Sequence, residues 1–319
     1  MSAVSRRAKV PRAPTSTDQI LGAFSRVPPS PTLDHLIRYL GTWSGTDKVL
    51  MLTQYSSKLL IAFLSLQHRV RLRLLEGTKS YHAPHGGSPV AARLERLVAL
   101  VSDARILFRI WGILPIVKWM IALERTPPPT RLLHNIERIQ GWSMLIYCPL
   151  EAVAYLGMHS IVPLSASKQN VCWLWGSRMW ALYVVLQLLH LVEDNRLLRL
   201  RARALERNRG HPVPSSSRSQ SSSSTSTAVT SEKQNSAATL TEEQAETRSL
   251  WNELHDRKEA ILNELWVNLG YLPLTVHWSH PTGLISEPWV GLFGTIAAVA
   301  GLRSGWKGTA APIDVAPVS

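Results

Sequence analysis

Apolar residues recur with a helical period over Pro89–Leu123, a stretch whose two halves differ in character. In the first half they line one face, which comprises Leu94, Leu97, Val98, Val101, Ala104, Phe108 and Gly112. The second half is apolar nearly all round and carries Trp111 and Trp119. Such a helix suits either the core of a soluble bundle or the headgroup boundary of a membrane, where a basic helix lies with its bulky apolar residues in lipid.

Similar periodicity predicts helices along most of the remaining chain, and we find no long alternation of the β-strand kind. Proline clusters at Pro28–Pro31 and Pro127–Pro129 separate some of them. The predicted helices cover residues 32–43, 48–75, 89–123, 130–157, 171–192, 241–278 and 288–302. The pattern therefore predicts an all-α protein.

Three stretches are candidates for crossing a membrane. Val171–Val192 is the first, because its length of about 22 residues suffices to span a bilayer. Thr282–Leu302 is the second, and Val49–Leu66, which contains Lys58, is the third. Six arginines follow the first candidate, at positions 196, 199, 201, 203, 207 and 209. Such a cluster marks the cytosolic side of a span, although a solvated helix face is the alternative.

Changes in composition divide the chain into five segments. A stretch rich in Ser, Thr, Gln and Pro cannot bury a core, so we expect it to be a disordered linker. The predicted segments are a disordered basic arm (1–31), a helical membrane-associated body (32–209), the Ser-rich linker (210–239), a C-terminal helical module with a terminal membrane helix (240–307) and a disordered tail (308–319).

The charge balance favours a lipid surface as the partner of this chain. With 35 Lys+Arg against 22 Asp+Glu, the net charge is +13, which is typical of proteins that bind nucleic acid or anionic lipid. Because 45% of the residues are hydrophobic and 12 are Trp, we expect lipid and no nucleic acid. The two cysteines, Cys148 and Cys172, have no metal-ligand spacing and are expected to be structural thiols.

The sequence offers no motif for catalysis, for a cofactor or for a metal. It lacks a Gly-rich phosphate loop, a nucleophile elbow and a zinc pattern. The pairs His277/His280 and His82/His85 have no third ligand nearby. Glu151 lies within an apolar helix, where a carboxylate needs a partner or a wet cavity. We therefore predict that the protein is not an enzyme.

Four groups of residues, taken in order along the chain, resemble the peroxin-11 family of peroxisomal membrane proliferation proteins. They are Gly45–Leu50 with Gln54–Leu60, then Ser102–Arg109, then Tyr147–Glu151, and finally Val276–Trp278 with Trp289–Ile296. The last group is similar to the gamma or C-type branch, and we expect a fungal source. The resemblance runs from Leu33 to Trp306 and is interrupted by the Ser-rich linker.

The resemblance implies an all-α, membrane-associated helical bundle with one or two transmembrane helices. It implies an integral peroxisomal membrane protein whose two ends face the cytosol. It also implies an amphipathic helix that inserts in one leaflet, self-associates into homo-oligomers and elongates the membrane before a dynamin-related GTPase cuts it. An import receptor for peroxisomal membrane proteins is a further implied partner.

By this match, the membrane-inserting role falls on Leu94, Leu97, Val101, Phe108 and Trp111. We expect Arg105 and Arg109 to hold the lipid headgroups. The working amphipathic part is Leu94–Trp111, and the more apolar stretch to Leu123, with Pro115 inside it, is expected to be buried.

Two alternatives to membrane remodelling stay open. One is a pore or metabolite channel of the peroxisomal membrane, in which Glu151 and Arg178 line a wet path. The other is an adaptor whose soluble helices recruit fission factors.

Overall fold

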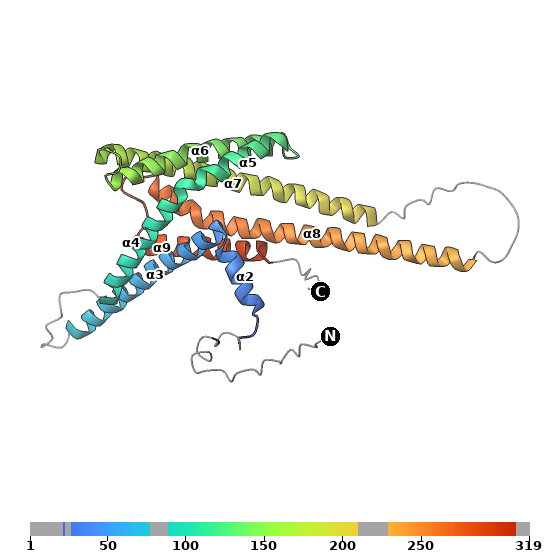
Figure 1. Ribbon diagram of the computed structural model, residues 1–319, viewed down its shortest axis with the longest axis horizontal. Helices are drawn as coiled ribbons and strands as arrows, with labels where there is room; N and C mark the ends of the chain where they lie inside the picture. Colours follow the sequence, from blue (N-terminus) through green and yellow to red (C-terminus); the bar gives the residue numbers. More distant parts are fainter. Residues whose placement is uncertain (1–21, 23–26, 77–88, 210–228, 311–319) are drawn as a thin grey trace, which may run out of the picture.

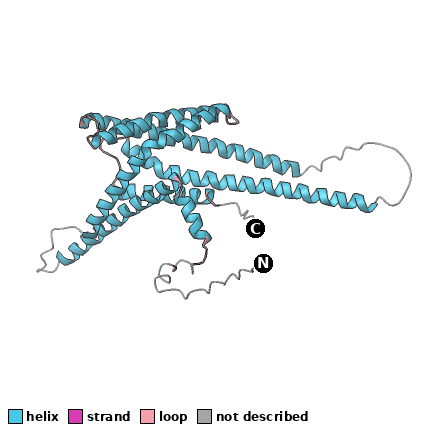
Figure 2. Cartoon of the chain, viewed as in Figure 1, coloured by secondary structure: helices cyan, strands magenta, loops and turns pink. Residues whose placement is uncertain are grey.

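The structure, a computed structural model, describes residue 22 and residues 27–76, 89–209 and 229–310 (Figure 1). Helices and short loops make up this part of the chain, and no strand occurs in it (Figure 2). The predicted all-α class is therefore confirmed. The helices are α2 (Pro31–Leu40), α3 (Trp43–Glu76), α4 (Pro89–Arg109), the 3-10 turn η2 (Ile110–Gly112), α5 (Ile113–Arg125), α6 (Arg131–Met158), α7 (Ala166–Arg209), α8 (Val229–Trp278) and α9 (Glu287–Gly308).

Local capping explains where two of these helices begin. The side chain of Ser30 accepts a hydrogen bond from the Leu33 amide, and Pro31 occupies the first turn of α2. Thr130 caps α6 in the same way by accepting from the Leu133 amide. The observed start of α6 agrees with the prediction from sequence.

The stretch predicted as one helix over Pro89–Leu123 consists of α4, η2 and α5. Pro115 has no amide hydrogen to donate to the carbonyl of Trp111, so regular α-helical bonding is interrupted at this point. Beyond the 3-10 turn, α5 changes direction and lies along α6 (Figure 1).

The long helices pack as a closed ring. In order around the ring, α3 packs on α9, α9 on α8, α8 on α7, α7 on α6, and α4 bridges α6 and α3. Helices α8 and α9, predicted as a separate C-terminal module, thus pack directly on α7 and α3. Residues 229–239 of the predicted linker belong to α8, whereas 210–228 lie outside the described residues.

Close helix approach at α9 builds the main apolar core, which comprises Met51, Tyr55, Leu274, Val290, Ala297 and Ala298. Gly294 lies directly under the ring of Tyr55, where an added Cβ would be 2.3 Å from ring carbons. Gly270 of α8 faces the α9 backbone, where an added Cβ would lie 2.8 Å from Ala297 N and Phe293 O. The small residues of α8 and α9 therefore serve tight packing within the bundle.

The two helices that are long and apolar enough to cross a membrane differ from the leading predictions. They are Trp43–Leu74, which includes the third candidate, and Pro89–Arg125. Within the described part of the chain, neither Val171–Val192 nor Thr282–Leu302 is as continuously apolar over this length. In α7, polar side chains lie within the apolar stretch and bond to neighbouring helices. Gln187 accepts from Gln140 at 2.6 Å and donates to Glu264 at 2.8 Å.

Candidate functional site

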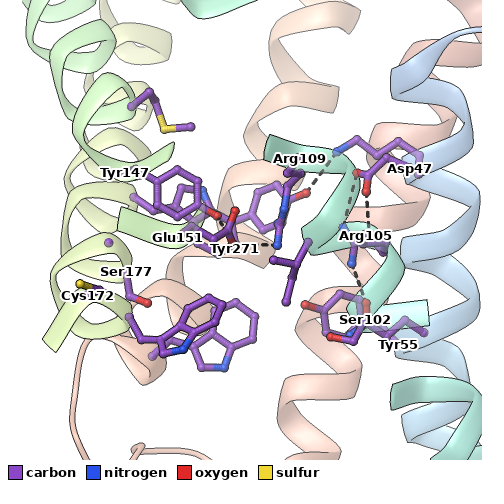
Figure 3. A pocket seen from close by; sticks show the side chains of 18 of the residues that line it. Asp47, Tyr55, Ser102, Arg105, Arg109, Tyr147, Glu151, Cys172, Ser177 and Tyr271 are labelled. Atoms are coloured by element: carbon purple, nitrogen blue, oxygen red, sulfur yellow. Dashed lines mark hydrogen bonds and ion pairs between the residues drawn. The ribbon is translucent and has the colours of Figure 1, made fainter. Parts of the chain in front are cut away.

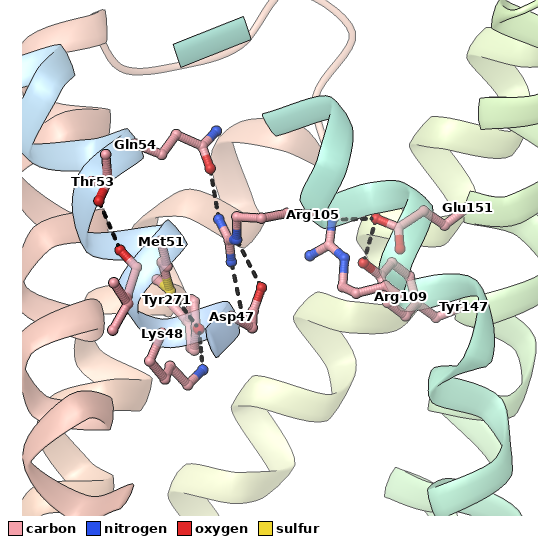
Figure 4. Close-up of polar contacts among 11 residues, drawn as sticks. Asp47, Lys48, Met51, Thr53, Gln54, Arg105, Arg109, Tyr147, Glu151 and Tyr271 are labelled. Carbon is pink, nitrogen blue, oxygen red and sulfur yellow. Dashed lines mark hydrogen bonds and ion pairs between the residues drawn. The ribbon is translucent and has the colours of Figure 1, made fainter. Parts of the chain in front are cut away.

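Arg105, on α4, points into the bundle and not towards solvent. Its side chain is 8% exposed, and its Nε donates to Asp47 Oδ1 at 2.8 Å. One Nη donates to Gln54 Oε1 at 2.7 Å (Figure 4). Asp47 and Gln54 lie on the same face of α3 about two turns apart, so a single guanidinium group joins two turns of α3 to α4.

Arg109, one turn further along α4, joins the opposite side of the ring. Its Nη2 donates to Glu151 Oε1 at 2.9 Å, and the Tyr147 hydroxyl donates to the same oxygen at 2.7 Å (Figure 4). The predicted need of Glu151 for a partner within an apolar helix is thus met by Arg109. The helix α4 is therefore held by two ion pairs that point to either side of it.

A third polar contact lies beside the first. The ammonium group of Lys48 donates to the Tyr271 hydroxyl at 3.2 Å, and that hydroxyl donates weakly to the sulfur of Met51 at 3.2 Å. This contact joins α3 to α8. Together the three contacts form a network, comprising Asp47, Lys48, Gln54, Arg105, Arg109, Tyr147, Glu151 and Tyr271, that crosses the centre of the ring.

A cavity of about 550 Å³ lies at this network, enclosed by α3, α4, α6, α7 and α8. Charged side chains that line it include Asp47, Arg105, Arg109 and Glu151 (Figure 3). Its lining also includes Trp173, Trp180 and Trp278. The rings of Trp180 and Trp278 are stacked with centroids 5.7 Å apart. The cavity therefore combines charged and aromatic side chains in its lining. Below, it is called the polar cavity.

The apolar stripe predicted on α4 divides between two faces. An inner part contains Val101, which is buried, and Leu94, which is partly buried. Leu97, Phe108 and Trp111 lie on the outside, with Trp111 70% exposed. We define the outer face as Leu97, Leu100, Leu107, Phe108, Trp111 and Leu114, all exposed large apolar side chains.

The structure places Arg105 and Arg109 on the inner side of α4. Arg105 pairs there with Asp47 and Arg109 with Glu151, and the Arg109 side chain stays 30% exposed. The exposed basic residues that flank the outer face are instead Arg93, Arg96 and Lys118. In the sequence, a basic residue on an apolar helix is compatible both with a buried ion pair and with a lipid contact.

The outer face continues onto the first helices. Trp43 at the start of α3 is half exposed, and its ring meets that of Phe108 edge to face with centroids 5.3 Å apart. Beyond it, α2 exposes the apolar side chains Leu33, Leu36, Ile37 and Leu40. Exposed apolar surface of this extent marks a membrane or protein contact.

Neither cysteine is paired, and the predicted structural role suits Cys148. Burial raises the pKa of the Cys148 thiol to about 11, so the thiol is neutral at physiological pH and a poor nucleophile. Cys172 lines the polar cavity.

The histidine pair at the end of α8 shapes a loop. His277 Nδ1 accepts from the amides of Leu284 and Ile285 at 2.8 and 3.0 Å. Gly283 has a positive φ of 67°, and a Cβ there would strike the His277 ring. Within the described ranges no three His, Cys, Asp or Glu side chains are grouped to hold a metal, and His82 and His85 lie outside those ranges.

Comparison with known proteins gives one match. The family model described as Peroxisomal biogenesis factor 11 (PEX11) matches residues 33–306. The chain belongs to the PEX11 family. No curated protein and no solved structure matches it. Membership makes this a peroxisomal membrane protein with a role in peroxisome biogenesis and proliferation, and the PEX11 family is a family of biogenesis factors, not of enzymes.

The PEX11 motifs quoted from the sequence meet in space at the network. Asp47 and Gln54 come from the first group, Arg105 and Arg109 from the second, and Glu151 from the third. Trp278 of the fourth group lines the polar cavity. Sequence reasoning identified these stretches but did not pair them, and it missed Lys48 and Tyr271 as partners. The signal available in the sequence is that each of the first three groups carries charged residues within or beside an apolar helix.

Proposed function

We propose that this PEX11 family member elongates the peroxisomal membrane during fission and proliferation by inserting the outer face of α4 and η2 into one leaflet. The observation that carries the proposal is that six large apolar side chains are exposed along α4, η2 and the first turn of α5, although α4 buries ion pairs on its other side. Complete removal of one large apolar side chain from water stabilises the inserted state by about 1.5–3 kcal/mol.

The distribution of charge favours a helix that lies in the plane of the membrane over one that crosses it. Exposed Arg93 and Arg96 flank the outer face near the start of α4, and Lys118 flanks it beyond η2. Charges spread along the whole length suit an interfacial helix, whose basic residues reach the headgroups. The break at η2 lets α5 turn away and pack on α6.

An inserted helix of this kind favours curvature. It expands the leaflet that it enters relative to the opposite leaflet, and self-association concentrates many such helices in one place. The exposed faces of α2 and the start of α3 enlarge the inserted area because Trp43 joins them to Phe108. We propose homo-oligomers because self-association brings many inserted helices together.

Further parts of the proposal follow from the resemblance to the family. We place the chain in the gamma or C-type branch and both of its termini in the cytosol. We propose a dynamin-related GTPase as the fission partner and an import receptor as the route to the membrane. Carbonate extraction tests integral insertion, and cleavage of terminal tags by external protease on intact peroxisomes tests the topology.

Full-length protein reconstituted in anionic liposomes tests the remodelling itself. We expect tubules by electron microscopy with the wild type and few with the double variant Phe108→Ser/Trp111→Ser. The matched control is Met158→Ser/Ile161→Ser, which changes two exposed apolar residues at the end of α6 and after it. Tubules of equal number with both double variants would refute a role for the outer face.

A second candidate function, a channel, is favoured by the polar cavity. Glu151 lines this cavity as the channel alternative requires, whereas Arg178 is not among its lining residues and lies over the Trp175 ring. Conductance of the reconstituted protein in a planar bilayer tests this candidate. An absence of ion current would rule out the channel function.

A further inference from the structure

The polar cavity has more positive than negative charge. Its lining includes four cationic side chains, Lys48, Lys58, Arg105 and Arg109, and two anionic ones, Asp47 and Glu151. Lys58 has a carboxylate partner outside the lining, Glu287, at 2.7 Å. After this pairing, the lining retains one positive charge that no carboxylate balances.

Lys48 holds that remaining charge. Arg105 and Arg109 each donate to a carboxylate, whereas the Lys48 ammonium donates to the neutral Tyr271 hydroxyl. Among the described residues, no carboxylate oxygen lies within the 4.0 Å that defines an ion pair with Lys48. A partly buried ammonium group without a counter-ion favours the binding of an anion.

Aromatic rings lead away from this charge. Tyr271, whose hydroxyl contacts Lys48, lies edge to face against Trp180 with ring centroids 5.3 Å apart. Trp180 is stacked on Trp278 and also on Tyr147, with centroids 5.7 and 6.0 Å apart. The lining beside Lys48 is therefore largely aromatic.

We propose that the polar cavity binds an anionic amphiphile, with its phosphate or carboxylate head at Lys48 and its apolar body against Trp180 and Trp278. A volume of about 550 Å³ suits a small organic ligand, and such sites combine apolar walls with a few placed polar groups. The site lies on the inner side of α4, so the proposal does not rest on membrane remodelling by the outer face.

Calorimetry on full-length protein in nanodiscs of neutral lipid tests the site, with decyl phosphate as the probe and decanol as its uncharged counterpart. We expect decyl phosphate to bind at least about tenfold more tightly, since one charge-assisted contact contributes that much. It should also quench tryptophan fluorescence. Equal affinity for the two probes, or no binding of decyl phosphate, would overturn the proposal without any variant.

Variants locate the binding. Lys48→Met should weaken decyl phosphate binding about tenfold, and Lys48→Arg should restore most of it. Trp180→Leu should weaken decyl phosphate more than it weakens methyl phosphate. Lys168→Met, at an exposed position of α7, is the matched control and should change nothing. If Lys48→Met and Trp180→Leu keep the helical circular dichroism of the wild type and bind decyl phosphate as it does, the site is wrong.

A second arm distinguishes two sources of the anion. Nanodiscs that contain dioctanoyl phosphatidate are compared with neutral ones. If the phosphatidate competes with decyl phosphate, a membrane phospholipid is the occupant. If decyl phosphate binds equally in both, the ligand enters as a free organic anion. Either result supports the site, because both require the binding of decyl phosphate at Lys48.

Discussion

Arg105 of α4 donates from Nε to Asp47 Oδ1 of α3 at 2.8 Å, and this pair determines which face of α4 points outward. Since Arg105 is directed inwards, Leu97, Leu100 and Phe108 must lie on the outside. The ion pair therefore orients the outer face that we propose to enter the membrane.

Loss of the Arg105 side chain should destabilise the bundle. Arg105→Met leaves the largely buried Asp47 without its charged partner, and breaking a buried pair in this way costs about 3 kcal/mol or more. The free energy of unfolding in detergent micelles measures the loss. Asp47→Asn in the Arg105→Met background should cost little further, because the uncompensated charge is then gone.

The matched control is Arg93→Met, an exposed position on the same helix. We expect it to change the free energy of unfolding by less than about 0.5 kcal/mol. If Arg93→Met and Arg105→Met had equal effects, the ion pair would not orient α4.

Gly294 should tolerate no side chain. Gly294→Ala places a Cβ 2.3 Å from the Tyr55 ring, so α3 and α9 must separate. Overpacking of this kind costs about 1–3 kcal/mol. Thermal melting measures it, with Gly308→Ala on the same helix as control, since a Cβ there meets no atom within 4 Å. Equal melting temperatures for the two variants would contradict the close packing.

The contact of α8 with α9 should weaken in acid. Hydrogen bonding to Lys307, with the nearby charges of Lys307 and Arg303, lowers the pKa of Glu259. Because this pKa is lower in the folded state, the stabilisation is fully present above the ordinary titration range of a glutamate and is lost as the pH falls through and below about pH 4.

Glu259→Gln should therefore lower the melting temperature at pH 7 and have little effect at pH 3. Glu253→Gln, on the same helix and exposed, is the control. A constant difference between wild type and Glu259→Gln from pH 7 to pH 3 would show that the ion pair does not act in this way.

Arg93 and Arg96, not Arg105, should confer a preference for anionic lipid. Each basic residue near an anionic surface contributes about 1 kcal/mol of attraction. Arg93→Gln/Arg96→Gln should therefore reduce tubule formation in anionic liposomes but not in neutral ones. Arg248→Gln/Lys258→Gln on α8 is the control and should leave the preference intact.

Much of the fold could be predicted from periodicity, because helices of this length carry their pattern locally. The span over residues 130–157 was predicted nearly to the residue, since Thr130 caps it and prolines precede it. The break within Pro89–Leu123 is not predicted, because a continuous apolar run does not show where a helix axis changes direction. Pro115 marks the position of the break.

The candidate site could be predicted in its stretches but not in its pairings. The apolar stripe on α4 straddles an inner and an outer face, and only the ion pairs to Asp47 and Glu151 decide where the division falls. Val171–Val192 is the first membrane-spanning candidate in the sequence because the partners of its polar residues cannot be identified there. Its polar residues, such as Gln187, bond to neighbouring helices that the sequence alone does not place beside it.

The depth of a spin label in the membrane tests the central claim most directly. Single cysteines are introduced at Leu97, Leu100, Phe108 and Trp111 in a chain in which Cys148 and Cys172 are replaced by Ser, and each is labelled and reconstituted in liposomes. We predict that oxygen collisions place all four labels at one shallow depth within a single leaflet. A steady change of depth by about 1.5 Å per residue would show that the helix crosses the membrane, and labels in water would show that it does not enter. Either result would contradict the account.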